Sequence, residues 1–131
     1  MRTSLVAILL LLSISLLAQE KPLQERYQNG RLKCTRFNME GTDVFMTYYE
    51  SGRLKERGTF RNGRREGIWE QYAENGALLA RASFRDGHRN GTWEFRDARN
   101  ELKGRLTYTD GQLAHAEQFG DARSLVASRE Y

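Results

Sequence analysis

The chain has 131 residues, enough for one domain at most, and a formal net charge of +4. Charged residues of both signs are interspersed, which is typical of a soluble surface and argues against a nucleic-acid-binding patch. The single cysteine, Cys34, excludes an internal disulfide. We expect a small, half-buried strand residue there, with an intermolecular bridge as the alternative.

The N-terminus predicts a secretory signal peptide over residues 1–18. Arg2 is followed by an apolar run, residues 5–17, and then by Ala18, the usual order of charged region, apolar region and small residue. The run is too short to span a bilayer comfortably. A buried N-terminal helix is the alternative, but such a helix would carry polar residues on one face, and residues 5–12 have none. We therefore expect an exported protein, located in the periplasm, in the cell envelope or outside the cell.

Residues 19–26 are polar, include Pro22, and are predicted to form a linker. Beyond Tyr27, short runs are separated by turn dipeptides. Asn-Gly and Asp-Gly favour type I′ turns, because both central residues of that turn need positive φ, and this turn fits a two-residue β-hairpin. Six such dipeptides predict a series of β-hairpins: Asn29-Gly30, Ser51-Gly52, Asn62-Gly63, Asn75-Gly76, Asp86-Gly87 and Asp110-Gly111.

Residues 49–97 repeat one pattern twice. Six residues recur after 24 positions, with Gly52, Leu54, Phe60, Gly63, Gly67 and Trp69 matched by Gly76, Leu78, Phe84, Gly87, Gly91 and Trp93. A fixed period of this size is typical of repeat arrays, in which one supersecondary unit is stacked many times. We therefore predict an all-β fold. It is an elongated antiparallel meander of hairpins over residues 27–119, followed by a tail, residues 120–131, whose Leu125, Val126 and Tyr131 are available to fold back over an edge strand.

Two-residue loops would fix the register of the strands. They set Tyr49 opposite Leu54. The spacing from Leu54 to Tyr72 is one residue longer than the corresponding spacings further along the chain, which predicts a β-bulge near Gln71. The further expected pairs are Glu56 with Trp69, Gly58 with Gly67, Leu78 with Phe95, Ala80 with Trp93, Ala82 with Gly91, and His115 with Leu106.

This register places leucines and aromatic rings on one face of the sheet and pairs of opposite charge, such as Lys55 and Glu70, on the other. Small residues next to the two tryptophans would leave room for an indole to lie flat on the neighbouring backbone. These residues are Gly58, Gly67, Ala82 and Gly91.

The pattern of Asn-Gly-x-Leu, an aromatic residue, Asn/Asp-Gly-x-x-x-Gly-x-Trp and a further aromatic residue resembles the MORN repeat variant. The resemblance extends over about residues 27–119, with two good copies in residues 49–95. It implies an elongated antiparallel sheet with one hairpin per repeat. In bacteria, proteins with such repeats are often labelled as antitoxin components, and eukaryotic MORN proteins are associated with scaffolding near membranes and with lipid contact.

No constellation predicts catalysis, a metal or another cofactor. His88 and His115 have no Cys, His or carboxylate at metal-ligand spacing, and no serine lies in a nucleophile-elbow context. The glutamates of the polar face are explained by ion pairing, and no glycine-rich turn leads into a helix. We predict a protein that is not an enzyme.

Two binding hypotheses follow. In the first, aromatic side chains line a concave strip that receives an unknown protein partner: Tyr49, Trp69, Tyr72, Trp93 and Phe95. The alternative is that these rings only fill the core of the repeats. In the second, basic residues at the hairpin tips contact anionic lipid or polysaccharide, with a merely solvated edge as the alternative: Arg61, Arg64, Arg65, Arg85 and Arg89. If the chain is not exported, an antitoxin-type role of neutralising a partner becomes the expectation.

Overall fold

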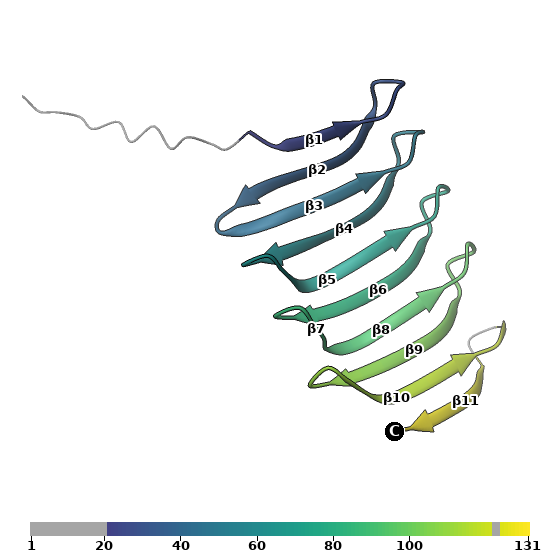
Figure 1. Ribbon diagram of the computed structural model, residues 1–131. Helices are drawn as coiled ribbons and strands as arrows, with labels where there is room; N and C mark the ends of the chain where they lie inside the picture. The colour runs from purple at the N-terminus through teal and green to yellow at the C-terminus, as the bar shows by residue number, and fades with distance from the viewer. Residues whose placement is uncertain (1–20, 122–123) are drawn as a thin grey trace, which may run out of the picture.

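A computed structural model describes residues 21–121 and 124–131, so the predicted signal peptide lies outside the described residues. The described chain is all β, as predicted, and forms one 11-stranded antiparallel sheet in which hairpins lie side by side along one direction (Figure 1). Its strands are β1 (Leu23–Arg26), β2 (Leu32–Met39), β3 (Thr42–Tyr48), β4 (Leu54–Arg61), β5 (Arg64–Tyr72), β6 (Leu78–Arg85), β7 (His88–Arg89), β8 (Gly91–Arg96), β9 (Leu102–Thr109), β10 (Gln112–Phe119) and β11 (Leu125–Glu130).

Each strand pairs with the next one along the chain, and β7 is a short extension that pairs with the end of β6. The two terminal strands, β1 and β11, therefore lie at opposite ends of an elongated sheet (Figure 1). Connections between consecutive strands alternate between the two long edges, where the strands end.

One long edge consists of type I′ turns. In each of them both central residues have positive φ, 49–52° for the first residue and 74–82° for the glycine. Type I′ turns are thereby confirmed at three of the six predicted dipeptides. The fourth turn, Glu40-Gly41, was not predicted because glutamate does not favour positive φ. The turns are Glu40-Gly41, Asn62-Gly63, Asp86-Gly87 and Asp110-Gly111.

The other long edge consists of a different turn, so the type I′ prediction is wrong at Asn29-Gly30, Ser51-Gly52 and Asn75-Gly76. In Tyr49–Gly52 the Gly52 amide donates to the Tyr49 carbonyl at 2.8 Å, and only Gly52 has positive φ, at 90°. A type I turn that ends in a residue of positive φ adds a bulge. Consequently Leu54 lies opposite Tyr48 and not opposite Tyr49 as expected.

A second bulge lies at each Gly-x-Trp motif and changes the predicted register. The pairing of β4 with β5 shifts between Arg57 and Thr59, where the chain of β5 passes through Gly67 at a φ of 69°. Expected pairs beyond the tips are therefore wrong. Glu56 lies opposite Gln71 and not Trp69, and Ala80 lies opposite Phe95 and not Trp93. A separate shift, between Leu113 and His115, puts His115 opposite Thr107 and not Leu106. A register shift does occur near Gln71, between Gln71 and Tyr72, but the extra residue is Leu79 of β6 and not a residue of β5 as expected.

At each bulge the indole N–H donates to a backbone carbonyl of the neighbouring strand. Trp69 Nε1 donates to the Thr59 carbonyl at 3.1 Å, and Trp93 Nε1 donates to the Ser83 carbonyl at 2.9 Å. The predicted close approach holds for Gly58, where a Cβ would lie 2.1 Å from the Trp69 ring. Close approach of an indole does not explain Gly67, where the nearest atom to a Cβ would be 3.8 Å away. That glycine is required because the bulge needs positive φ; the same holds for Gly91, with a φ of 70°.

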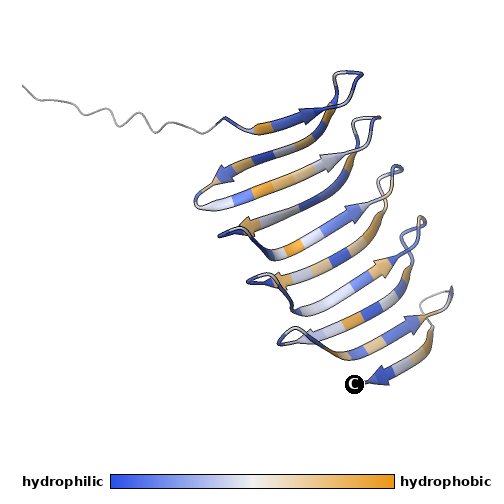
Figure 2. Cartoon of the chain, in the orientation of Figure 1, coloured by the Kyte–Doolittle hydropathy of each residue, from blue (hydrophilic) through white to orange (hydrophobic). Residues whose placement is uncertain are grey.

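The rings of one face form a continuous ladder along the middle of the sheet, with successive centroids 4.9–6.5 Å apart. We call the side of the sheet that carries this ladder the ring face. Only Trp69, Leu102 and Tyr108 are buried apolar residues among those described, at 4%, 5% and 8% exposure. Apolar residues recur in hairpin after hairpin and do not gather into one globular core (Figure 2). The ladder consists of Phe45, Phe60, Trp69, Phe84, Trp93 and Tyr108.

The sheet extends further at both ends than the sequence predicted. β1 lies within the predicted linker and pairs with β2, and β11 lies within the predicted tail and pairs with β10. Leu125 and Val126 thus join the sheet through their backbone, and their side chains remain 56% and 64% exposed. Tyr131, at 66% exposure, donates its amide to the Ala114 carbonyl.

Replacing Gly58 with alanine is expected to lower the free energy of unfolding by about 1–3 kcal/mol, because the new methyl must push the Trp69 indole off the backbone. Indole fluorescence should shift to the red as Trp69 becomes more exposed. Chemical denaturation followed by tryptophan emission measures both effects. The repeat itself indicates the direction, since Ala82 stands 24 residues after Gly58 and the corresponding Trp93 is only half-buried.

Gly104→Ala is the matched control. Gly104 also lies within a strand, but a Cβ there would meet its nearest atom at 3.6 Å, an ordinary contact. We expect this variant to be about as stable as the parent or slightly more stable. Equal destabilisation by both substitutions would contradict the role given to Gly58.

Candidate functional site

Three of the five predicted partner-binding residues share one recess on the ring face. Trp69, Trp93 and Phe95 line a hollow of about 140 Å³ between β5, β6 and β8. Phe95 is 39% exposed, whereas Trp69 is 4% exposed, so the recess offers one accessible ring beside buried ones. The remaining lining residues are Glu56, Arg65, Gln71, Ala80, Arg81, Ala82 and Phe84.

The other two candidates lie elsewhere, so the predicted strip of five rings does not form. The Tyr72 hydroxyl donates to a carboxylate oxygen of Glu70 at 2.7 Å, on the opposite face of the sheet. The Tyr49 hydroxyl donates to the Tyr72 carbonyl at 2.8 Å, beside the edge of the longer turns. A bulge in β5 near Gln71, as expected, would have put Tyr72 on the ring face. The extra residue is instead Leu79 of β6, so Tyr72 lies on the same face as Glu70. Tyr49 lies in the longer turn before β4.

The longer turns are joined into a ladder by side chains that reach from one turn to the next. Asn29 and Arg31 donate to backbone carbonyls of the turn at residues 49–52, and Arg53 donates to the Glu74 carbonyl at 2.6 Å. Asn75 donates in turn to the Ala98 carbonyl at 3.1 Å. These bonds satisfy carbonyls that the turns leave free, and they fix the spacing of the hairpins along this edge.

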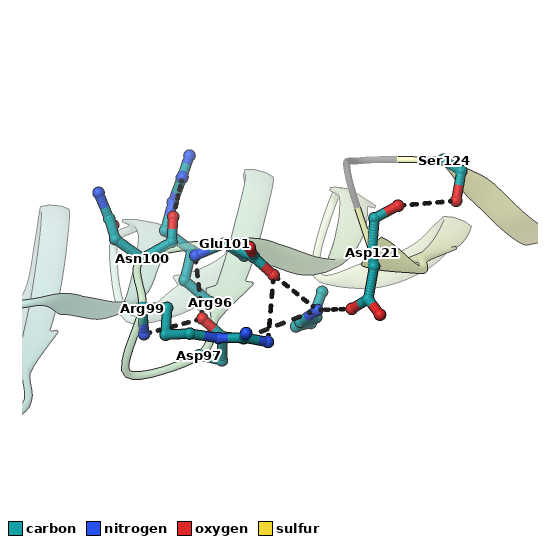
Figure 3. Close-up of polar contacts among 8 residues, drawn as sticks. Arg96, Asp97, Arg99, Asn100, Glu101, Asp121 and Ser124 are labelled. Atoms are coloured by element: carbon teal, nitrogen blue, oxygen red, sulfur yellow. Dashed lines mark hydrogen bonds and ion pairs between the residues drawn. The ribbon is translucent and has the colours of Figure 1, made fainter.

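The turn Asp97–Asn100 of this edge is held by ionic contacts (Figure 3). Asp97 Oδ1 accepts the amides of Arg99 and Glu101, at 2.9 and 3.0 Å. Hydrogen bonds from the Glu101 amide and then the Arg99 amide lower the pKa of Asp97. Lys103 bonds Glu101 and Asp121 at 3.1 and 3.0 Å, and its pKa is raised, first by the hydrogen bond to Asp121 and then by that to Glu101.

The face opposite the rings carries a row of alternating charges, one from each strand, and we call it the charged face. Cross-strand neighbours of opposite charge occur along five consecutive strand pairs. The sequence predicted the alternation, although Glu70 pairs with Arg57 and not with Lys55. The row consists of Arg57, Glu70, Arg81, Glu94, Arg105 and Glu117.

Glu70 is the one buried carboxylate in this row, at 5% exposure. It accepts hydrogen bonds from Arg57 at 2.6 Å, from Arg81 at 2.6 Å and from the Tyr72 hydroxyl at 2.7 Å. Burial alone would raise the pKa of Glu70, but the hydrogen bonds from Tyr72, Arg81 and Arg57 outweigh it and lower the pKa to about 2. Such a fully bonded ion cluster joins β4, β5 and β6 and fits a structural role.

The five predicted anion-contact arginines do not act as one group. Arg64 forms an ion pair with Asp86 at 3.0 Å, and Arg61 and Arg85 have no ion pair within the part of the chain that the structure describes. Arg65 and Arg89 lie on the ring face, where their guanidinium groups stack over rings. Arg85 and Arg89 border a shallow recess of about 280 Å³ at the type I′ edge, which also contains Asp86, His88, Asn90, Asp110 and Gly111.

Within residues 21–121 and 124–131, no group of three or more His, Cys, Asp or Glu residues is arranged to hold a metal ion. His115 lies on the charged face beside Glu117 and Glu130, and not on the ring face as expected. The described residues also form no helix that is long and apolar enough to cross a membrane.

Comparison with known proteins gives one family match. Residues 44–62 and 65–86 match the MORN repeat variant. The hairpins of this region are thus similar to MORN repeats. The match covers most of β3 to β6, which carry four of the six ladder rings and the Glu70 cluster. It supports the resemblance that the sequence pattern indicated.

Comparison with curated proteins gives no match. Two solved structures resemble the backbone. One is a point mutant of TarM from S. aureus in complex with Fondaparinux, alpha-GlcNAc-glycerol and UDP, with a TM-score of 0.47 and 6% identity over 73% of this chain. The other is TarM, with a TM-score of 0.46 and 8% identity over 72% of this chain. This chain spans 21% of each of those chains. At these TM-scores and identities, neither likeness indicates a function.

Replacing Glu70 with glutamine is expected to lower the free energy of unfolding at neutral pH by about 2 kcal/mol, because two arginines lose their charged partner. The parent should also lose stability in acid. Since the pKa of Glu70 is lowered from 4.5 to about 2, its contribution is complete above about pH 4.5 and is lost as the pH falls towards 2. Denaturation midpoints measured over that range should decline more steeply for the parent than for the variant.

Glu94→Gln is the matched control, since Glu94 follows Glu70 by 24 residues and pairs with Arg96 and Arg105 at 3.2 and 3.4 Å, while its side chain is 23% exposed. This substitution should lower the free energy of unfolding by less than Glu70→Gln does, and the loss of stability between about pH 4.5 and 2 should remain. If Glu70→Gln loses stability in acid as steeply as the parent, other carboxylates cause that loss.

Proposed function

We propose that the protein is a non-catalytic interaction module that binds a partner protein on the ring face, around the recess of Trp69, Trp93 and Phe95. The recess carries the proposal. It is apolar, its backbone walls are held by the bulges, and Phe95 stands accessible beside it. Aromatic side chains in rigid surroundings contribute most of the binding energy in protein interfaces. The MORN repeat match is in keeping with a binding role.

The charged face is the less suitable surface. Its row of arginines and glutamates is already paired across the strands, so a partner would have to replace internal ion pairs by external ones. Phe95 itself has no such pair to break; the recess beside it contains a hydrogen bond from Gln71 to Glu56, at 3.0 Å. Burial of an apolar side chain there removes ring surface from water without breaking a bond.

Contact of the type I′ edge with anionic lipid or polysaccharide is a second candidate. The exposed and unpaired Arg61 and Arg85, at the tips of successive hairpins in the described chain, favour it. Arg64 is less available because of its pair with Asp86. A role as an antitoxin-type neutralising partner would require the chain to remain in the cytoplasm.

We also propose that the protein is exported and acts outside the cytoplasm, on the basis of the signal-peptide pattern of residues 1–18. The expected result is a mature chain that begins close after Ala18. Intact-mass measurement of the protein purified from its producing cells checks this, with a variant carrying Leu10→Arg as the unprocessed control. A full-length mass in the parent would contradict export and favour the antitoxin-type role.

A photo-crosslinking residue at position 95 is expected to capture a partner protein, because this side chain is the accessible ring of the recess. The same residue at position 92 is the control, since Thr92 is exposed on the opposite face of the same strand. Crosslinked products from producing cells are compared by gel mobility and mass spectrometry. Discrete products from position 95 alone support the proposal; equal labelling from both faces would reject it.

A further inference from the structure

Two arginines on the ring face stack over aromatic rings in an orientation that leaves their N–H donors available to a carboxylate. The Arg65 guanidinium carbon lies 4.4 Å from the centroid of Trp69 and 5.3 Å from that of Phe84. The Arg89 guanidinium carbon lies 5.5 Å from the centroids of both Trp93 and Tyr108. The two arginines are 24 residues apart, so this posture belongs to the repeat.

Stacking occupies the face of a guanidinium group and not its edge. The N–H donors lie in the plane of the group and remain directed outwards, where they match the two oxygens of a carboxylate. Within the described chain, the Arg65 side chain donates no hydrogen bond, and that of Arg89 makes one, to the Tyr108 hydroxyl oxygen at 3.3 Å. Both side chains are exposed, so a ligand can reach these donors.

The protein itself shows what such an arginine binds. Arg36 lies 5.2 Å from the centroid of Phe60 and holds Asp43 at 2.6 Å; Arg105 lies 5.5 Å from that of Phe119 and holds Glu117 at 3.3 Å. Arg57, stacked on Tyr72, holds Glu70. In residues 21–121 and 124–131, Arg65 and Arg89 are the stacked arginines of the ring ladder that have no carboxylate partner.

The two open arginines flank the recess. Arg65 lies on β5 and is itself part of its lining, and Arg89 lies on β7, two strand positions further. Neighbouring strands are about 4.8 Å apart, so the two side chains start about 10 Å from each other, across the strands. A bound segment would thus run across the hairpins, with an apolar side chain in the recess and acidic side chains on the arginines.

We propose that the ring face binds an acidic peptide segment of a partner protein, with two carboxylates held by Arg65 and Arg89 and an apolar residue held beside Phe95. This inference rests on the proposed function and specifies the chemistry of the partner. Because the rings already order both guanidinium groups, binding costs little further side-chain entropy. The charge of the two arginines selects acidic segments over neutral ones.

The test is a selection from a library of random peptides displayed on phage, with the full chain as bait. Enriched peptides should contain at least two acidic residues that flank an apolar one. A selected peptide, labelled with fluorescein, is then titrated with the protein and followed by anisotropy. We expect Arg65→Gln and Arg89→Gln each to weaken binding by about tenfold. Arg65→Lys should weaken it too, since lysine keeps the charge but not the bidentate geometry.

Arg61→Gln and Arg85→Gln are the matched controls. They remove the same charge at the same 24-residue spacing, at positions where no ring stacking occurs in the described chain. They should change the affinity by less than about twofold. Denaturation midpoints identify any variant that loses stability. If Arg65→Gln is destabilised, the affinities of Arg89→Gln and Arg65→Lys decide the outcome.

Three results would overturn the inference: enriched peptides without acidic residues, no enrichment at all, or equal losses from the stacked and the unstacked pairs. Sedimentation with phosphatidylcholine vesicles, with and without phosphatidylserine, covers the membrane alternative. Vesicle binding that needs Arg61 and Arg85 as much as Arg65 and Arg89, without peptide selection, would replace this inference by the lipid one. Crosslinking from position 95 that persists in Arg65→Gln/Arg89→Gln would retain the interaction module and reject the acidic partner.

Discussion

The structure depends on how a single-layer sheet shields its own apolar side. No second layer covers the described hairpins, and only three of their apolar residues fall below a tenth of full exposure. The bulge at each Gly-x-Trp motif shields that side, because the ring lies on the neighbouring strand and its N–H donates to a backbone carbonyl there. Each indole thereby joins two strands by packing and by a hydrogen bond. Neighbouring rings then cover one another along the ladder.

The two long edges of the sheet differ in their turns and in the contacts that their side chains make. Type I′ turns are tight, and arginines close to them in successive hairpins stack over rings of the ladder. The longer turns expose carbonyls, which side chains of the preceding hairpin bind. Since both features recur with the 24-residue period, the spacing of hairpins and the spacing of surface groups are set by the same repeat.

The sequence predicted the repeat, the all-β meander and the separation of rings from charges, because period and turn dipeptides are visible without coordinates. It did not predict the register beyond each tip. Counting from Asn62-Gly63 gives the correct pair Phe60–Arg65 and then fails at Gly67, where β5 gains two residues relative to β4. The sequence motif Gly-x-Trp does not reveal whether its glycine is needed for space or for positive φ. The repeat length also does not reveal which strand carries an extra residue, and for that reason Tyr72 was misplaced; the structure puts it beside Glu70 on the charged face.

The difference between the two repeats shows how stability and binding are connected on the ring face. Over Gly58 the Trp69 indole lies on the backbone at 4% exposure, whereas Trp93, above Ala82, is only half-buried. Where rings are not covered by protein layers, arginine side chains cover them, because the guanidinium group stacks on a ring and still keeps its donors in water. A second protein layer would have hidden those donors. The arginines that shield the rings of a single-layer sheet are therefore also the groups through which that face can bind an anionic partner.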